Sequence, residues 1–231
     1  MKKFLIAAAI LFGTLQSAVF ADSYLISNAE LVKIQTQIMQ TGFKILNANN
    51  IEKRMMFTYD SSCKSINAST SIRDRTIVVC RGMYNMLDNE DELEAVLGHE
   101  ISHGVDSYDG IFRGSLSWLS YYCAPKKFEY KADKRAVDFM VRAGYNPVAM
   151  IVMMNKSFSQ YNYDWRSTHP LSSRRMMEVY EYIYKKYPEY LVNNKYIDNI
   201  YYQNFLLTSK SNRKKFEEKV KRHSNEKVHY L

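Results

Sequence analysis

The segment Glu94-Ala95-Val96-Leu97-Gly98-His99-Glu100-Ile101-Ser102-His103 combines a run of apolar residues with two histidines four positions apart. Apolar side chains recur at helical spacing through this part of the chain: Leu93, Val96, Leu97 and Ile101. This pattern predicts a buried helix. Asn89 is followed three residues later by Glu92, which resembles a capping box, so we expect the helix to run from there to about Val105.

The two histidines of this helix predict a metal centre. Residues four apart lie on one face of a helix, so His99 and His103 can present two imidazole nitrogens to one ion. Glu100 lies next to them, where it can act as general base on a metal-bound water. The spacing therefore predicts a catalytic Zn²⁺, one per chain. Two histidines and a glutamate on a buried helix would be costly without such a partner.

A catalytic zinc needs a third protein ligand, and the sequence offers two. Asp109 follows His103 by six residues, as in metzincin-like enzymes, but Asp106 stands where those enzymes need glycine. The other candidate is Glu129. It shares a predicted helical face with a second acid and with apolar residues: Ala132, Asp133, Ala136, Val137 and Met140. On that face, Glu129 would bind the metal and Asp133 would accept the second N–H of a ligand histidine.

A third histidine lies in the segment Thr168-His169-Pro170-Leu171-Ser172-Ser173-Arg174-Arg175. His169 could donate to the oxyanion that forms when water attacks a peptide carbonyl. It could instead cap a helix or occupy the open metal position in a resting state.

The rest of the chain predicts an α+β fold that is mainly helical. Short apolar or β-branched runs predict strands at 55–59 and 76–80. Helical periodicity or helix punctuation by Pro and Gly predicts helices at 28–48, 125–144, 147–158 and 171–187. We expect a peptidase domain over residues 22–190. Residues 191–231 would then form a basic extension that is helical or partly disordered.

Residues 1–21 have the pattern of a secretory signal peptide. A basic start, the apolar run Phe4–Phe12 and the small residues before Asp22 fit a cleaved signal, and the run is short for a retained membrane anchor. We therefore expect export to the periplasm or cell envelope, with no transmembrane span in the mature protein. Export makes a disulfide plausible, and Cys63 and Cys80, which flank the predicted strands, are the best candidates. Cys123 would then be free or intermolecular.

The formal charge of +8 falls to +6 once residues 1–21, with Lys2 and Lys3, are removed. A basic protein favours anionic surfaces such as lipid headgroups, so peripheral contact with an anionic membrane is one expectation, and a solvated basic face is the other. We expect no nucleic-acid partner.

Taken in order, these segments resemble the family of zinc peptidases that includes the CAAX prenyl proteases, HtpX, BepA and LoiP. The resemblance rests on Asn67-Ala68, Ile77-Val78-Val79 with Arg81-Gly82, the segment 94–103, residues 129–133 and His169-Pro170 with a downstream arginine. It implies a gluzincin-like core, in which a small sheet lies beside the active-site helix and its edge strand binds substrate.

The resemblance also implies residue roles. It makes His99, His103 and Glu129 the zinc ligands and Glu100 the base, with His169 as a catalytic residue. Asp133 would support a ligand histidine, whereas the remaining matches would bind substrate: Asn67, Ala68 and Arg175. The chain departs from the family pattern after Asn67-Ala68, where it reads Ser69-Thr70-Ser71. We thus predict a zinc endopeptidase that acts on protein or peptide substrates in envelope quality control. The alternative is a non-catalytic exported zinc-binding protein.

Overall fold

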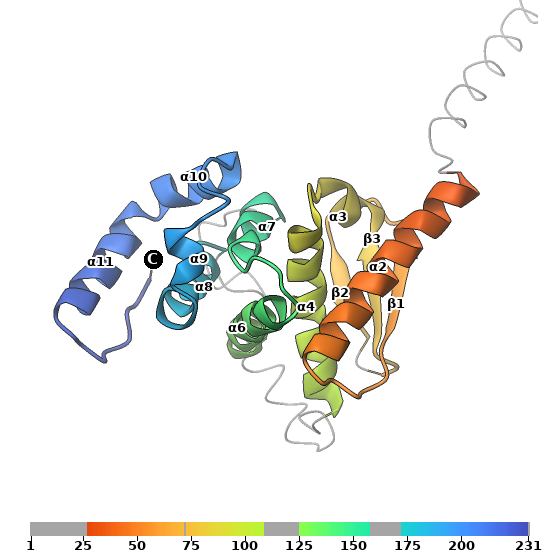
Figure 1. Ribbon diagram of the computed structural model, residues 1–231, viewed down its shortest axis with the longest axis horizontal. Coiled ribbons are helices and arrows are strands. Elements are labelled where there is room, and N and C mark those ends of the chain that lie inside the picture. Colours follow the sequence, from red (N-terminus) through yellow and green to blue (C-terminus); the bar gives the residue numbers. More distant parts are fainter. Residues whose placement is uncertain (1–26, 72, 109–124, 158–171, 231) are drawn as a thin grey trace, which may run out of the picture. The chain divides into compact units, whose positions relative to one another are not determined.

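The computed structural model describes residues 27–71, 73–108, 125–157 and 172–230, which divide between two units after residue 34. Helix α2 (Asn28–Ala48) begins in the first unit and continues into the second (Figure 1). Ser27 caps it, because its Oγ accepts a hydrogen bond from the backbone N–H of Glu30 at 3.2 Å. The helix has the bounds that its periodicity predicted.

The sheet of the second unit has three strands in the order β1-β3-β2. Strand β1 (Met56–Asp60) runs parallel to the central β3 (Thr76–Cys80), whereas the short β2 (Ala68–Thr70) is antiparallel to β3. The apolar pattern predicted β1 and β3 to within one residue. It did not predict β2, because Ala-Ser-Thr has no apolar alternation and becomes a strand only by pairing with β3.

Residues 35–48 of α2 pack on strand β1. The Gln35 amide bonds the backbone of this edge strand at Phe57 O and Tyr59 N, each at 2.8 Å, so it takes the place of a neighbouring strand. Gly42 lies over the Phe57 ring, and a Cβ there would stand 2.5 Å from a ring carbon. Glycine is therefore required for this close approach.

The second layer is helical, and α4 (Glu90–Tyr108) lies between the sheet and the helices α6 (Pro125–Arg142) and α7 (Ala149–Ser157) (Figure 1). Asn89 caps α4 as predicted, since its Oδ1 accepts from the Glu92 N–H at 3.1 Å. A short helix, α3 (Arg81–Met86), follows β3 directly and was not predicted. Helix α8 (Ser172–Lys186) packs on α6 and α7.

The chain beyond α8 forms three further helices: α9 (Glu189–Val192), α10 (Ile200–Thr208) and α11 (Lys210–Lys221). Asn199 caps α10 by accepting from the Tyr201 and Tyr202 N–H groups. Aromatic side chains from these helices are buried, and Phe205 and Phe216 lie against the ring of Tyr180 in α8. The polar tail therefore contributes its own small hydrophobic cluster. Overall, the fold is α+β and mainly helical, as predicted.

Candidate metal centre

Helix α4 carries His99 and His103 on one face, as their spacing predicted. The two Nε2 atoms lie 3.2 Å apart, and the side chains are 13% and 15% exposed. The helix is anchored in the core by apolar residues with little or no exposure: Leu93, Val96, Leu97 and Ile101. This burial fixes the helix and thereby the direction of both imidazoles.

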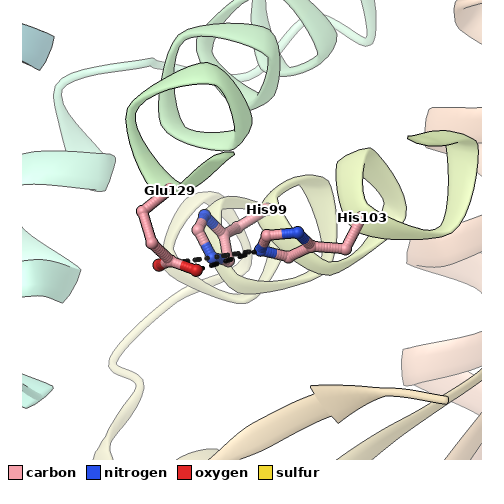
Figure 2. A group of neighbouring side chains, drawn as sticks. All are labelled: His99, His103 and Glu129. Atoms are coloured by element: carbon pink, nitrogen blue, oxygen red, sulfur yellow. Dashed lines mark hydrogen bonds and ion pairs between the residues drawn. The ribbon is translucent and has the colours of Figure 1, made fainter. Parts of the chain in front are cut away.

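Glu129 reaches the two histidines from helix α6. Its Oε2 lies 3.5 Å from His99 Nε2 and its Oε1 lies 3.4 Å from His103 Nε2 (Figure 2). The two helices approach closely because Gly98 faces Ala136, and a Cβ on Gly98 would stand only 3.4 Å from the Ala136 Cβ. Small residues at this crossing therefore let a carboxylate on α6 meet histidines on α4.

These three side chains fit a tetrahedral metal ion. Their ligand atoms all lie within 4.8 Å of one another. A tetrahedral zinc with ligand bonds of about 2.0–2.1 Å separates its ligand atoms by about 3.3–3.4 Å. The observed separations of 3.2, 3.4 and 3.5 Å match those edges. Two imidazoles and a carboxylate are also a ligand set that catalytic zinc sites use, with one position left for water.

Asp133 lies one helical turn beyond Glu129, and its Oδ1 is 2.9 Å from Nδ1 of His99. This contact places the ring proton on Nδ1 and leaves Nε2 for the metal. Burial disfavours the charged form of His99, but the hydrogen bonds to Asp133 and Glu129 outweigh it and raise the pKa of His99 to about 10. A metal ion would therefore displace a proton when it binds.

Arg175 comes from α8 and contacts both carboxylates. Its Nε and Nη2 donate to Asp133 at 2.8 and 2.6 Å, and its Nη1 lies 3.1 Å from Glu129 Oε2. Its side chain is only 2% exposed. Burial alone would raise the pKa of Asp133, but Arg175 and His99 hold that pKa below its usual range. Arg174, its neighbour in the sequence, forms neither of these bonds in the described structure.

Glu100 points toward the edge strand of the sheet. The Thr70 hydroxyl lies 2.7 Å from Glu100 Oε2 and 2.8 Å from the Glu100 carbonyl oxygen. Sequence reasoning missed Thr70, since it did not predict β2. The only signal for it was the departure from the family pattern at Ser69-Thr70-Ser71.

A cavity of about 90 Å³ opens beside the histidines. Asn67 and Ala68, which were predicted to bind substrate, line it together with His99, Glu100, Glu129 and Arg175. The rest of its wall is apolar and comes from four other places in the chain: Ile66, Met83, Val96 and Met153. Sequence reasoning used Val96 only to predict that the helix is buried and assigned no role to the other three side chains.

Cys63 and Cys80 form a disulfide, with Cα atoms 5.0 Å apart. Cys80 ends β3 and Cys63 precedes the cavity residues, so the bond ties that wall to the central strand. Gly82 brings the same loop close: its N–H donates to Cys63 O at 3.3 Å, and a Cβ there would stand 2.2 Å from the Lys64 oxygen.

Three residues considered from the sequence lie outside the described residues: Asp109, Cys123 and His169. Helix α4 continues through Asp106 to Tyr108, so the chain does not turn back directly after His103 as the Asp109 reading requires. Asp106 instead pairs with two cations of α6, Lys131 at 2.7 Å and Arg135 at 2.8 Å.

A buried helix with two histidines and a glutamate, a third candidate ligand on a second helix and a cavity beside them define a metallopeptidase. Comparison with protein families agrees: the model of Peptidase family M48 matches residues 32–124 and 116–183. The chain belongs to this family. No curated protein matches it. Among the described residues, no helix combines the length and apolarity needed to cross a membrane.

Proposed function

We propose that the chain is a zinc-dependent endopeptidase. The observation that carries this proposal is the convergence of His99, His103 and Glu129 at tetrahedral spacing, with Glu100 on the next position of the same helix. Family membership supports the same chemistry.

The site residues divide the work of peptide hydrolysis. Zinc, when bound, supplies the Lewis acidity that lets a water molecule lose a proton near neutral pH. Glu100 accepts that proton as the water attacks the peptide carbonyl, and returns it to the leaving amine. Asp133 orients His99, and Arg175 neutralises the two buried carboxylates. His169 stays our prediction for the donor to the oxyanion.

We propose that substrates bind as extended chains along β2. This strand is at the edge of the sheet, and Asn67 and Ala68 lie both at its start and in the cavity wall. An added strand bonds to backbone groups rather than to a chain terminus, so internal peptide bonds can reach the site. Unfolded or misfolded envelope proteins offer such extended segments, which supports a role in quality control.

Metal content and cleavage of casein, measured together, test this proposal. We expect about one zinc per wild-type chain and internal casein fragments by mass spectrometry. Glu100→Gln should retain zinc and lose cleavage by at least about a hundredfold. Glu129→Ala should lose both zinc and cleavage. Glu52→Gln, which changes an exposed acid outside the metal site, should change neither zinc content nor cleavage. Bound zinc without cleavage by the wild type would support the non-catalytic alternative instead.

We also propose that the protein is exported. The signal-like pattern of residues 1–21 and the Cys63–Cys80 disulfide support this, since disulfides persist in oxidising compartments. Cell fractionation followed by N-terminal sequencing tests it, and a start at Asp22 is the expected result. An unprocessed chain in the cytoplasm would contradict it.

The charge distribution supports peripheral contact with an anionic membrane. Residues 22–183 contain nineteen basic and nineteen acidic residues, whereas residues 184–231 contain eleven and five, a formal charge of +6. Ile200 and Leu207 on α10 are 75% and 74% exposed. Exposed apolar side chains beside lysines favour lipid over nucleic acid.

Vesicle sedimentation tests this contact. We expect the protein to bind vesicles with phosphatidylglycerol and not vesicles of phosphatidylcholine alone, with weaker binding at high salt. Lys210→Gln with Lys214→Gln should weaken binding, whereas Lys53→Gln with Lys64→Gln, which removes equal charge elsewhere, should not. An equal loss of vesicle binding with both pairs of substitutions would contradict this contact, because the net charge alone would then explain the binding.

A further inference from the structure

One hydroxyl group of the edge strand lies against two oxygens of Glu100. Thr70 Oγ1 is 2.7 Å from the carboxylate Oε2 and 2.8 Å from the carbonyl oxygen of the same residue. A threonine hydroxyl has a single proton. It can therefore donate to the carboxylate, or rotate to the carbonyl without moving the rest of the side chain.

Thr70 itself is held firmly. Its backbone pairs with Ile77 of β3, and the next residue, Ser71, donates to Thr76 O at 2.9 Å. Its methyl group faces Gly104 of α4, where an added Cβ would stand 3.8 Å from it. The β-branched side chain thus has one side against the helix and the other at Glu100, which limits its rotamers.

The position of Thr70 matters for the carboxylate. A glutamate side chain has three rotatable bonds, and a general base acts only within hydrogen-bonding distance of its proton donor. A fixed donor on Oε2 restrains the carboxylate and leaves Oε1 available. Glu100 also lines the cavity with His99 and Glu129, so this restraint acts at the metal centre.

We propose that Thr70 is a positioning residue that holds the Glu100 carboxylate for its role as base; this inference rests on the proposed peptidase function. Strand β2 then has two tasks. Its first residue, Ala68, lines the substrate cavity, and its last, Thr70, orients the base. A substrate that pairs with this strand would be aligned with Glu100 by the same three residues.

Three variants separate the hydroxyl from the bulk of the side chain. Thr70→Ser keeps the hydroxyl and loses the methyl group. Thr70→Val keeps the shape and loses the hydroxyl. Thr70→Ala loses both and serves where valine disturbs the strand. Thr58→Val, the same substitution on the opposite edge strand β1, is the matched control.

For the zinc-loaded enzyme with a casein-derived peptide, we expect Thr70→Val and Thr70→Ala to lower kcat about tenfold, with KM and zinc content unchanged. Thr70→Ser should stay within about threefold of wild type. Thr58→Val should match wild type. Full kcat in Thr70→Val would overturn the proposal, because the hydroxyl would then be dispensable. An equal loss of kcat in Thr70→Ser would also overturn it, because the loss would then come from the methyl group.

A second readout does not depend on activity. In metal-free protein with ¹³C-labelled glutamate carboxyls, the Glu100 signal can be assigned from its loss in Glu100→Gln. We expect that signal to move in Thr70→Val and to keep its position in Thr70→Ser. An unmoved signal in Thr70→Val overturns the contact itself. Should wild-type protein cleave no peptide, the proposed function fails, while this measurement still decides whether Thr70 holds Glu100.

Discussion

Arg175 and Asp133 form a buried two-pronged salt bridge, with Nε–Oδ2 and Nη2–Oδ1 distances of 2.8 and 2.6 Å. The same Asp133 Oδ1 lies 2.9 Å from His99 Nδ1, so Arg175 on α8 is connected to His99 through this carboxylate, besides its direct contact with Glu129. The orientation of a metal-binding histidine on α4 therefore depends on a cation two helices away.

Breaking this pair should weaken metal binding. We expect Arg175→Met to lower zinc affinity about 10–100-fold, because loss of such a supporting contact misaligns the ligand. It should also lower the free energy of unfolding by about 3–5 kcal/mol, since Asp133 would be left buried without its cation. Competition with a zinc chelator and urea unfolding measure the two effects.

Lys134→Gln is the matched control. Lys134 bonds Glu178 at 2.6 Å and so also joins α6 to α8, but it is 36% exposed. Its loss should cost at most about 1 kcal/mol and leave zinc affinity unchanged. An equal effect of both variants on zinc would mean that helix packing, and not Asp133, transmits the change.

Glu94 is buried within α4, and neither of its carboxyl oxygens has a hydrogen-bond partner in the described structure. Burial raises the pKa of Glu94 to about 10, although the positive charge of Lys44 acts in the opposite direction and lowers it. The native state thus holds a proton that the unfolded chain releases near pH 4.5. Stability should therefore fall as the pH rises from 4.5 toward 10.

Glu94→Gln removes this titration. We expect the variant to equal wild type near pH 4.5 and to be more stable by roughly 1–3 kcal/mol at pH 8, as measured by urea unfolding. Glu52→Gln, at an exposed position, is the control. A constant difference between Glu94→Gln and wild type over this range would contradict a protonated Glu94.

Glu181 lies on α8 and binds side chains from the C-terminal part of the chain. It pairs with Lys185 and Tyr230, and with Lys219 of α11 at 3.1 Å. Burial alone would raise its pKa, but the hydrogen bonds from these three groups outweigh it and lower the pKa of Glu181 to about 2. The stabilisation is present above about pH 4.5 and is lost as the pH falls toward 2.

Glu181→Gln should loosen the C-terminal residues at neutral pH. We expect a loss of about 1–2 kcal/mol at pH 7 that shrinks below pH 4.5. Amide hydrogen exchange of residues 225–230 should quicken in the variant. If exchange there is unchanged, Lys219 and Tyr230 do not depend on Glu181 for their position.

Removal of the disulfide should affect the part of the cavity wall that contains Asn67 and Ala68, and not the metal ligands. The bond closes a segment of 17 residues, so Cys63→Ser with Cys80→Ser should cost about 3 kcal/mol. Hydrogen exchange at 67–70 should quicken, whereas zinc affinity should hold, because His99, His103 and Glu129 come from α4 and α6. Cys123→Ser, which leaves the bond intact, is the control.

Helices α2, α4, α6, α7 and α8 and three metal-binding candidates could be predicted from sequence, because each follows from spacing along one helix or from its Pro and Gly punctuation. His99 and His103 are four apart, and Glu129 shares a helical face with Asp133. Contacts across elements could not be predicted in this way. Thr70 meets Glu100 only because a short polar segment pairs with β3. The family resemblance selected Arg175 and not Arg174 by spacing, but as a substrate-binding residue, and that spacing did not indicate its salt bridge to Asp133.

The C-terminal helices show the same limit. Residues 191–231 are basic as a whole, so the sequence left open whether they are helical or partly disordered. Phe205 and Phe216 decide the outcome, because they reach Tyr180 on α8. That pairing joins positions 25 and 36 residues apart, a separation at which periodicity has no information.

The Cys63–Cys80 bond encloses β2 in a covalent ring. Both ends of this wall are joined to the central strand, one through the disulfide and one through the chain, which restrains how far the wall can move. For the proposed peptidase, selection would then act on the shape of the substrate before its sequence: a chain enters only where it has already lost its own structure. The enzyme would distinguish damaged proteins from intact ones by geometry alone.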